Sequence, residues 1–190
     1  TDPAETGAVT IALPEDVQAE ALDVPAEFLA DREWPIRRPR PDRDALRRAV
    51  AAIRRAARPL IVAGGGVLYS GAEQQLAALA ETTGIPVATT QAGGGSLRWD
   101  HPQYLGGIGA TGTAAANRIA AIADVVIGIG IRYSDFTTAS RSAFQDPGVR
   151  FVNINVVALD AHKLGSDLPL VADAREALIE IAGELAGFTI

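Results

Sequence analysis

The sequence has no cysteine and no methionine, and only two histidines among its 190 residues. The missing cysteines exclude disulfides, thiolate metal sites and cysteine nucleophiles. His101 and His162 lie far apart without a metal-type spacing, which favours local hydrogen bonding over a role as metal ligands or general bases. No GxSxG motif surrounds any serine, so a hydrolase triad has no support. We therefore predict no catalytic and no metal-binding residue in this chain.

The sequence also lacks an excess of positive charge and any long apolar run. Its net charge of −6 has the wrong sign for generic attraction to phosphates, which argues against a nucleic-acid or membrane partner. No run approaches the roughly 18 apolar residues of a membrane span, and the first 30 residues do not resemble a signal peptide. We expect a soluble, cytoplasmic protein. Because the chain opens on Thr1, we also expect a piece of a longer polypeptide.

The stretch around which the chain is organised is residues 59–66, Pro-Leu-Ile-Val-Ala-Gly-Gly-Gly. Four consecutive apolar residues predict a strand buried on both faces, as in a parallel sheet. The glycines predict a tight turn, followed by a helix that begins near Ser70 as its N-cap and ends at Gly84. They lack the GxGxxG and GK[ST] spacings, so turn formation is favoured over contact with a phosphate.

The remaining pattern alternates strands and helices. Further strands are expected over residues 8–13, 86–89, 124–130, 150–155 and 168–172. Helices are expected from Asp42 to before Pro59, from Thr113 onward and over residues 174–185, and long loops after Gly93 and over 131–148. The alternation predicts a three-layer, doubly wound, Rossmann-like α/β domain with a mainly parallel sheet of five or six strands.

Prolines mark the best domain boundary. Pro35, Pro39 and Pro41 stand among charged residues and predict a stiff, extended connector. We therefore divide the chain into the remnant of a preceding domain (1–24), a linker (25–41) and the main domain (42–187).

Glycine and hydroxyl residues gather at three predicted strand ends, in segments 64–66, 106–113 and 128–134. Backbone N–H groups in such turns favour an anion such as phosphate, so three loops on one sheet edge would form a nucleotide-shaped crevice. Alternatively, the glycines only permit close packing. The sequence leaves both interpretations open.

Several short motifs carry a family resemblance across nearly the whole chain. They are Ile36-Arg-Arg-Pro-Arg-Pro41, Arg58-Pro-Leu-Ile-Val-Ala-Gly-Gly-Gly-Val67, Trp99-Asp-His-Pro102, Gly109-Ala-Thr-Gly-Thr113, Arg132-Tyr-Ser-Asp-Phe-Thr-Thr138 and Phe151-Val-Asn-Ile-Asn155. Together they resemble the central domain of thiamine diphosphate-dependent enzymes of the acetohydroxyacid synthase type. The first and fifth motifs point to members that hydrolyse a carbon–carbon bond of a cyclic dione in myo-inositol catabolism.

The resemblance implies a central domain of such a hydrolase, inactive when isolated. Thiamine diphosphate and Mg²⁺ would bind in flanking domains of the same polypeptide, the first of them a pyrimidine-binding domain. The intact enzyme would act on a small molecule as a homodimer or homotetramer. The alternatives are the central domain of an acetohydroxyacid synthase-like transferase and a non-catalytic nucleotide-binding or assembly module.

In flavin-bearing relatives this domain holds FAD. The matching positions here are Gly109, Thr111, Gly112 and Thr113 in one loop, together with Arg132 and Asn155. The chain departs from those relatives because Asn153 and Asn155 replace acidic residues that would accept hydrogen bonds from ribose with charge assistance. An empty crevice is therefore the better expectation, and FAD or an adenine nucleotide at these six residues is the alternative.

Overall fold

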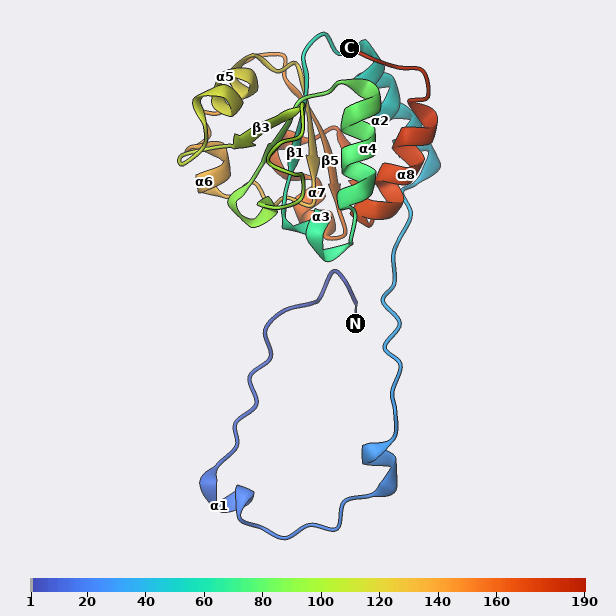
Figure 1. Cartoon of the computed structure of the whole chain (residues 1–190), viewed down its shortest axis with the longest axis vertical. Coiled ribbons are helices and arrows are strands. Elements are labelled where there is room, and N and C mark those ends of the chain that lie inside the picture. The colour runs from blue at the N-terminus through green and yellow to red at the C-terminus, as the bar shows by residue number, and fades with distance from the viewer. Residues whose placement is uncertain (1) are drawn as a thin grey trace. The chain divides into compact units, whose positions relative to one another are not determined.

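The computed structural model describes residues 2–190, which form two units (Figure 1). One unit is an arm that ends at Arg37, and the other is a compact unit of residues 38–190. Each is described by itself.

The compact unit is built on a six-stranded sheet in which every strand pair is parallel. The strands are β1 (Pro59–Ala63), β2 (Val87–Thr89), β3 (Tyr104–Gly107), β4 (Val125–Ile129), β5 (Arg150–Asn155) and β6 (Leu168–Val171). Their order is β3-β2-β1-β4-β5-β6, so the predicted segment at 59–66 does hold a central strand. The doubly wound, Rossmann-like fold is thereby confirmed.

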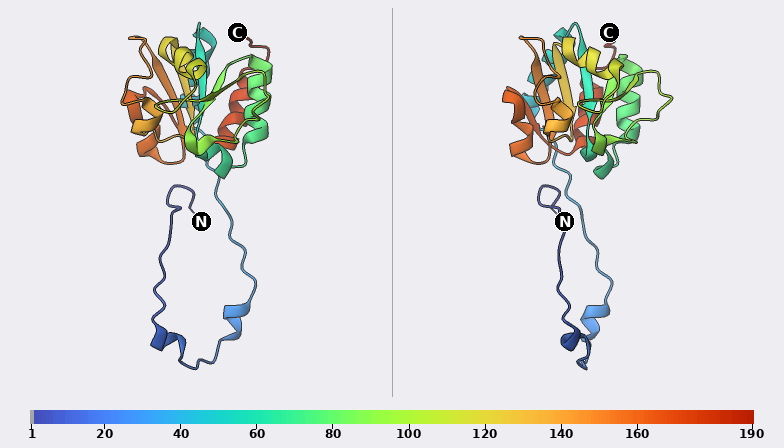
Figure 2. Two further views of the ribbon diagram at one scale, coloured as in Figure 1. Left: turned by 60° about the vertical axis from the view of Figure 1, so that its left-hand side comes forward. Right: turned by 90° about the vertical axis from the view of Figure 1, so that its left-hand side faces the viewer.

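Helices cover both faces of this sheet (Figure 2). The longer ones are α2 (Arg43–Arg55), α4 (Glu73–Thr83), α5 (Ala114–Ile122) and α8 (Ala174–Glu184), and the short ones are α3 (Gly65–Tyr69), α6 (Asp135–Thr138), α7 (Ala158–Ala161), η2 (Gln91–Gly93) and η3 (Lys163–Gly165). Helices α2, α4 and α8 pack on one face, and α5 packs on the other. The sheet therefore has a core on each side.

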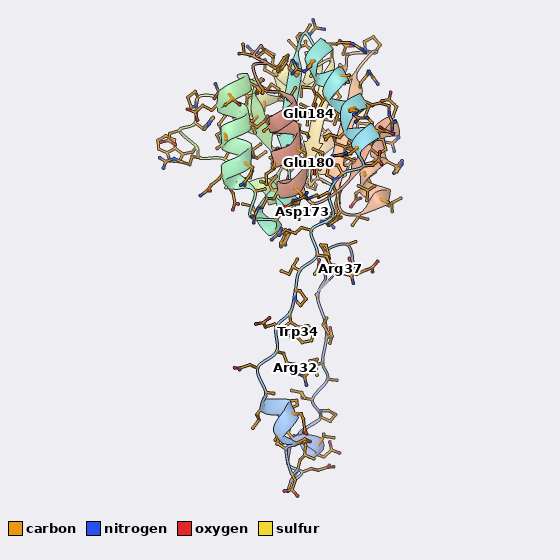
Figure 3. The ribbon with its side chains drawn as sticks, turned by 90° about the vertical axis from the view of Figure 1, so that its right-hand side faces the viewer. Arg32, Trp34, Arg37, Asp173, Glu180 and Glu184 are labelled. Carbon is orange, nitrogen blue, oxygen red and sulfur yellow. The ribbon has the colours of Figure 1, made fainter. Side chains whose placement is uncertain are left out.

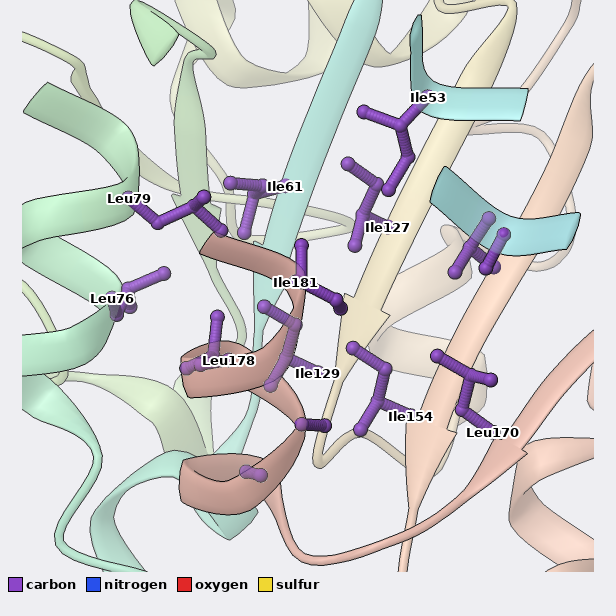
Figure 4. Packing of buried hydrophobic residues seen from close by; sticks show 14 of the residues in the cluster. Ile53, Ile61, Leu76, Leu79, Ile127, Ile129, Ile154, Leu170, Leu178 and Ile181 are labelled. Atoms are coloured by element: carbon purple, nitrogen blue, oxygen red, sulfur yellow. The ribbon is translucent and has the colours of Figure 1, made fainter. Parts of the chain in front are cut away.

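Strand β1 shows why a continuous apolar run suits this position. Its residues are all buried, with Ile61 in the core beneath α2, α4 and α8, and Leu60 and Val62 in the core beneath α5. Figure 4 shows the first of these cores, in which Ile61 and Ile127 of the sheet lie among side chains of the covering helices. Alternate residues of a strand face opposite sides, so two covered faces require apolar residues at every position.

The helix ends follow local side-chain chemistry. The Asp42 carboxylate accepts hydrogen bonds from the backbone N–H groups of Asp44 and Ala45 at 3.0 and 2.9 Å, which confirms it as the N-cap of α2. Thr113 caps α5, as predicted. Gly84 ends α4 with φ of 73°, also as predicted.

Within the compact unit, the predictions for Ser70 and for the loop after Gly93 are wrong. Ser70 does not cap the helix after β1, because its hydroxyl donates to the carbonyl of Gly66 at 2.6 Å and closes the short helix α3 instead. Helix α4 begins three residues later, at Glu73. The predicted loop after Gly93 contains strand β3, whose Tyr-Leu-Gly-Gly sequence has no alternating pattern.

The arm, residues 2–37, contains only two short helical segments, α1 (Glu15–Gln18) and η1 (Ala26–Leu29). The strand predicted over residues 8–13 does not form. A strand needs a neighbouring strand for its backbone hydrogen bonds, and the described part of the arm offers none. No residue of this segment is buried.

Candidate functional site

All three predicted glycine-rich segments lie at the carboxyl edge of the sheet, because they follow β1, β3 and β4 and the strands are parallel. The chain winds outward in opposite directions from β1 and β4, so the switch point of the fold lies between these two strands. Open α/β sheets bind ligands in the crevice at such a point. This edge is therefore the candidate site.

Backbone packing closes the switch point. The N–H of Gly64 donates to the carbonyl of Ile129 at 2.8 Å, and the N–H of Gly66 donates to that of Gly130 at 3.0 Å. A Cβ atom on Gly66 would lie 2.6 Å from the Cα of Gly130, closer than real side chains come. The glycines therefore let two turns touch, and the N–H groups of Gly64 and Gly66 already bond to protein carbonyls.

The predicted loop at 109–113 is tied to the start of α5. The Asn117 side chain accepts a hydrogen bond from the N–H of Gly109 and donates one to its carbonyl, both at 2.9 Å. Gly109 has φ of 96°, and a side chain there would collide with the carbonyl of Phe136. The N–H of Gly112 donates to the carbonyl of Gly109 at 2.9 Å. Ala110, Thr111 and Thr113 of this loop are exposed. Asn117, which fixes the loop, was missed because nothing in the sequence marks its helical position.

The backbone N–H and the hydroxyl of Thr113 also make hydrogen bonds within the protein. Its backbone N–H donates to Gly107 at 2.8 Å, and its hydroxyl donates to the carbonyl of Leu105 at 2.6 Å while accepting from the N–H of Ala116. The side chain thus joins β3 to α5.

Asn155 and Arg132 lie in a second cluster at the end of β4 and β5. The Asn155 amide donates to the carbonyl of Ile131 at 3.0 Å, and its oxygen accepts from the N–H of Val157 at 2.9 Å. Arg132 is exposed, and its backbone carbonyl accepts from Lys163 Nζ at 2.8 Å. The two clusters meet where the N–H of Ala110 donates to the carbonyl of Phe136 at 2.8 Å.

A buried polar pair below this edge was missed by sequence reasoning. Tyr133 Oη donates to Asn153 Oδ1 at 2.6 Å, and the Asn153 amide donates to the carbonyl of Lys163 at 2.9 Å. Burial raises the pKa of the Tyr133 phenol, so the group stays neutral. Phe144 and Phe151 meet its ring edge to face, with centroids 6.4 and 5.9 Å away. This arrangement is typical of a packed core, not of an acid or base.

In the part of the chain that the structure describes, charged side chains form no candidate metal site. Within residues 2–190, no group of three or more His, Cys, Asp or Glu side chains could hold a metal ion. His101 Nδ1 accepts from the N–H of Gln103 at 3.3 Å, and His162 Nδ1 lies 2.9 Å from the carbonyl of Ala158. Both make the local contacts that their spacing predicted. In the same described range, no helix is long and apolar enough to cross a membrane.

The residues predicted to contact FAD do not fit it in this arrangement. A dinucleotide needs free N–H donors for its phosphates and acceptors for its ribose. Here the N–H groups of Gly109, Gly112 and Thr113 and both ends of the Asn155 amide bond to the protein. Their nucleotide role stays a prediction.

Comparison with known proteins identifies relatives of this chain. A family model described as the thiamine pyrophosphate enzyme central domain matches residues 46–181. The 3D-(3,5/4)-trihydroxycyclohexane-1,2-dione hydrolase 1 of Bacillus cereus (strain ZK / E33L) and the corresponding hydrolase of Bacillus anthracis are each 50% identical over 185 residues, 97% of this chain. The chain spans only 29% of either relative.

A solved structure from Mycobacterium smegmatis, described as a thiamin diphosphate-dependent enzyme, shares the fold. It superposes with a TM-score of 0.65 over 82% of this chain and 30% of its own, at 23% identity.

Proposed function

The chain belongs to the family of thiamine pyrophosphate enzyme central domains, and from that membership we propose that it is the central domain of a hydrolase acting on 3D-(3,5/4)-trihydroxycyclohexane-1,2-dione. The observation that carries the proposal is 50% identity to hydrolases of that name over 97% of the chain. The activity belongs to a longer polypeptide, because the relatives are about three times the length of this chain.

We propose that the sites for thiamine pyrophosphate and Mg²⁺ lie in flanking domains, and that the intact enzyme is a cytoplasmic homodimer or homotetramer. The chemistry that this cofactor supplies is a nucleophilic carbon that adds to a carbonyl. Such chemistry needs a carboxylate at the pyrimidine and a metal at the diphosphate, and among the described residues no group of three or more His, Cys, Asp or Glu side chains could hold that metal. We therefore propose that this chain contributes by holding the flanking domains in position.

Its anchoring of the linker supports this positional role. Arg38 pairs with Asp173 at 3.0 Å, and Asp173 is buried at the start of α8. The N–H of Asp173 donates to the carbonyl of Pro39 at 2.8 Å, and Arg40 pairs with Glu176 at 3.2 Å. We propose that residues 1–24 are the end of a preceding pyrimidine-binding domain and that residues 25–41 are the linker. These contacts fix where that linker joins the compact unit of the central domain.

We further propose that the loop of Gly109 to Thr113 is a structural joint between β3, α5 and α6, and not a nucleotide site. Titration calorimetry of the 190-residue chain with FAD and with ADP should show no heat of binding. Tight FAD binding that disappears in the double variant Arg132→Ala, Thr113→Val would instead support the nucleotide role.

An assay with thiamine pyrophosphate, Mg²⁺ and the dione tests the main proposal. We expect turnover by the polypeptide that includes the flanking domains and none by the 190-residue chain. The intact protein assayed on pyruvate, the substrate class of the transferase alternative, is the matched control. Turnover of pyruvate but not of the dione would overturn the proposed substrate, and full activity of the 190-residue chain would overturn its positional role.

A further inference from the structure

Helix α2 exposes a row of positive charge on a chain whose net charge is −6. All five arginines of this 13-residue helix are exposed, and they are Arg43, Arg47, Arg48, Arg54 and Arg55. The buried side chains Leu46, Val50 and Ile53 recur at helical spacing, so the arginines are confined to the arc that faces away from the sheet. We call the five arginines the basic row.

Helix α8 carries negative charge on the side that adjoins α2. Glu176, Glu180 and Glu184 follow one another at intervals of four residues, which places them on one side of the helix. Glu176 pairs with Arg40 at 3.2 Å, and the carbonyl of Glu184 accepts from Arg54 Nη2 at 2.7 Å. Figure 3 shows Glu180 and Glu184 along α8, next to α2. We call the three glutamates the acidic row.

Helices α2 and α8 lie side by side and run in the same direction. The N–H of Asp173, the N-cap of α8, donates to the carbonyl of Pro39 at 2.8 Å, just before α2 begins. The contact between Arg54 and Glu184 joins the last turns of the two helices. Both helices pack on the same face of the sheet. Their outer surface, which we call the α2–α8 face, therefore presents the basic row and the acidic row as neighbours.

Many charges of the two rows are free to meet a partner. Arg47 pairs with Asp44 at 3.0 Å. Among residues 2–190, six charged groups of the two rows form no ion pair, and they are those of Arg43, Arg48, Arg54, Arg55, Glu180 and Glu184. Charge of both signs is thus left exposed on one face.

Neighbouring rows of opposite charge favour a partner that also carries both signs. Nucleic acid or an anionic membrane would meet the acidic row as well as the basic one, and the net charge of −6 repels either. A second copy of this chain carries the same two rows. A two-fold axis parallel to the helices exchanges the two sides of the face without reversing the helices, so each basic row lies over the acidic row of the other copy. The face is therefore complementary to itself.

We propose that the α2–α8 face is a self-association surface, at which two copies of this chain meet about a two-fold axis parallel to the two helices. Ile179, which is 47% exposed on α8, adds an apolar side chain to this face. A helix of 13 residues is about 20 Å long and neighbouring helices lie about 10 Å apart, so the face offers about 400 Å² per copy. Stable interfaces bury about 800 Å² per partner. We therefore expect a weak dimer that forms at high protein concentration and low ionic strength.

Sedimentation equilibrium of the 190-residue chain, at concentrations up to about 1 mM, measures this association. We expect a monomer–dimer equilibrium whose dissociation constant rises at least about tenfold between about 0.05 and 0.5 M salt, because the Debye length falls from above to below about 10 Å over this range. A chain that stays monomeric at every concentration, or a dimer that salt does not weaken, would overturn the proposal.

Charge reversal identifies the face and its symmetry. Arg47→Glu with Arg48→Glu reverses the middle of the basic row, and Glu180→Arg with Glu184→Arg reverses most of the acidic row. Each double variant by itself should bind at least about tenfold more weakly than the original chain, because like charges then face each other. An equimolar mixture of the two variants should associate again, because the introduced glutamates face the introduced arginines and the original rows face each other. A mixture that stays monomeric would reject the two-fold arrangement.

The matched control is Arg118→Glu with Arg141→Glu. Both arginines are exposed, and Arg118 lies on α5, on the opposite face of the sheet. This control changes the net charge as much as reversal of the basic row does, but it should leave the dimer in place. Loss of the dimer in the control as well would mean that net charge alone sets the association, which would contradict the proposal.

Circular dichroism of each variant checks that the chain still folds. Should loss of the pair between Arg47 and Asp44 disturb α2, Arg48→Glu with Arg55→Glu tests the same row, because neither of these arginines forms an ion pair with a described residue. No measurement in this series involves dione turnover. Self-association therefore stands or fails separately from the proposed function.

Discussion

The arm and the compact unit contain similar patterns of apolar residues, but only the compact unit buries them. Both contain apolar side chains at strand and helix spacings, such as Val9, Ile11 and Leu13 in the arm. In the compact unit such side chains are buried, whereas in the arm those three are 84%, 76% and 66% exposed. The difference teaches that a pattern specifies an element only where other elements cover its apolar face, because burial and not the pattern supplies the stabilising free energy.

The largest contrast should come from a core substitution in α8. Leu178 is fully buried between α8 and the sheet, so Leu178→Ala removes apolar contacts and leaves a cavity. We expect a loss of about 2–5 kcal/mol in the free energy of unfolding. Urea denaturation of the 190-residue chain measures it. A loss under about 1 kcal/mol would mean that this core is loosely packed.

A smaller loss should follow Tyr133→Phe, which leaves the packing of the ring but removes the donor to Asn153. The buried Asn153 oxygen is then left without that partner. We expect a cost of about 1–3 kcal/mol at neutral pH. Tyr69→Phe is the matched control, because Tyr69 is 91% exposed and should give no change.

The same tyrosine should make stability depend on alkaline pH. Burial raises the pKa of Tyr133 in the folded state above its ordinary value of about 10. The folded protein therefore holds this proton more tightly than the unfolded chain does. Its contribution is complete below about pH 10 and is lost as pH rises above that value. We expect the unfolding midpoint to fall between about pH 10 and 12, and to fall less in Tyr133→Phe than in Tyr69→Phe. Equal slopes would contradict the assignment.

The N-cap of α8 should give a moderate effect. Asp173 accepts from the N–H groups of Arg175 and Glu176 and also pairs with Arg38. Asp173→Ala should cost about 0.5–2 kcal/mol. Asp173→Asn keeps a capping oxygen and loses the ion pair, so the difference between the two variants in thermal unfolding separates capping from anchoring of the linker. Identical losses would show that the ion pair dominates.

The smallest effect should come from the arm. Leu22 is 79% exposed, so Leu22→Ala in the 190-residue chain should change the free energy of unfolding by less than about 0.5 kcal/mol. It is chemically the same substitution as Leu178→Ala. A loss approaching that of Leu178→Ala would break the comparison, because it would mean that the arm packs in a core of its own.

The sequence by itself determined those strands and helix ends that depend on residues close together along the chain. Continuous apolar runs marked β1 and β4, and Asp42, Thr113 and Gly84 marked helix ends through contacts within a few residues. The short motifs also identified the family, because their order and spacing extend over the whole fold. The short-range chemistry of caps and turns needs no knowledge of the rest of the chain.

Only the tertiary structure decided which backbone groups of the glycine-rich edge bond within the protein. The N–H groups of Gly64 and Gly109 are not free for a phosphate, because they bond to Ile129 and Asn117. Ile129 is distant along the chain from Gly64, and Asn117 lies within helix α5, where nothing in the sequence marks it. The glycine-rich strand β3 and the buried pair of Tyr133 and Asn153 likewise exist only through partners on other strands and loops. The arm shows the reverse case, since an alternating pattern without a neighbouring strand has nothing to bond to.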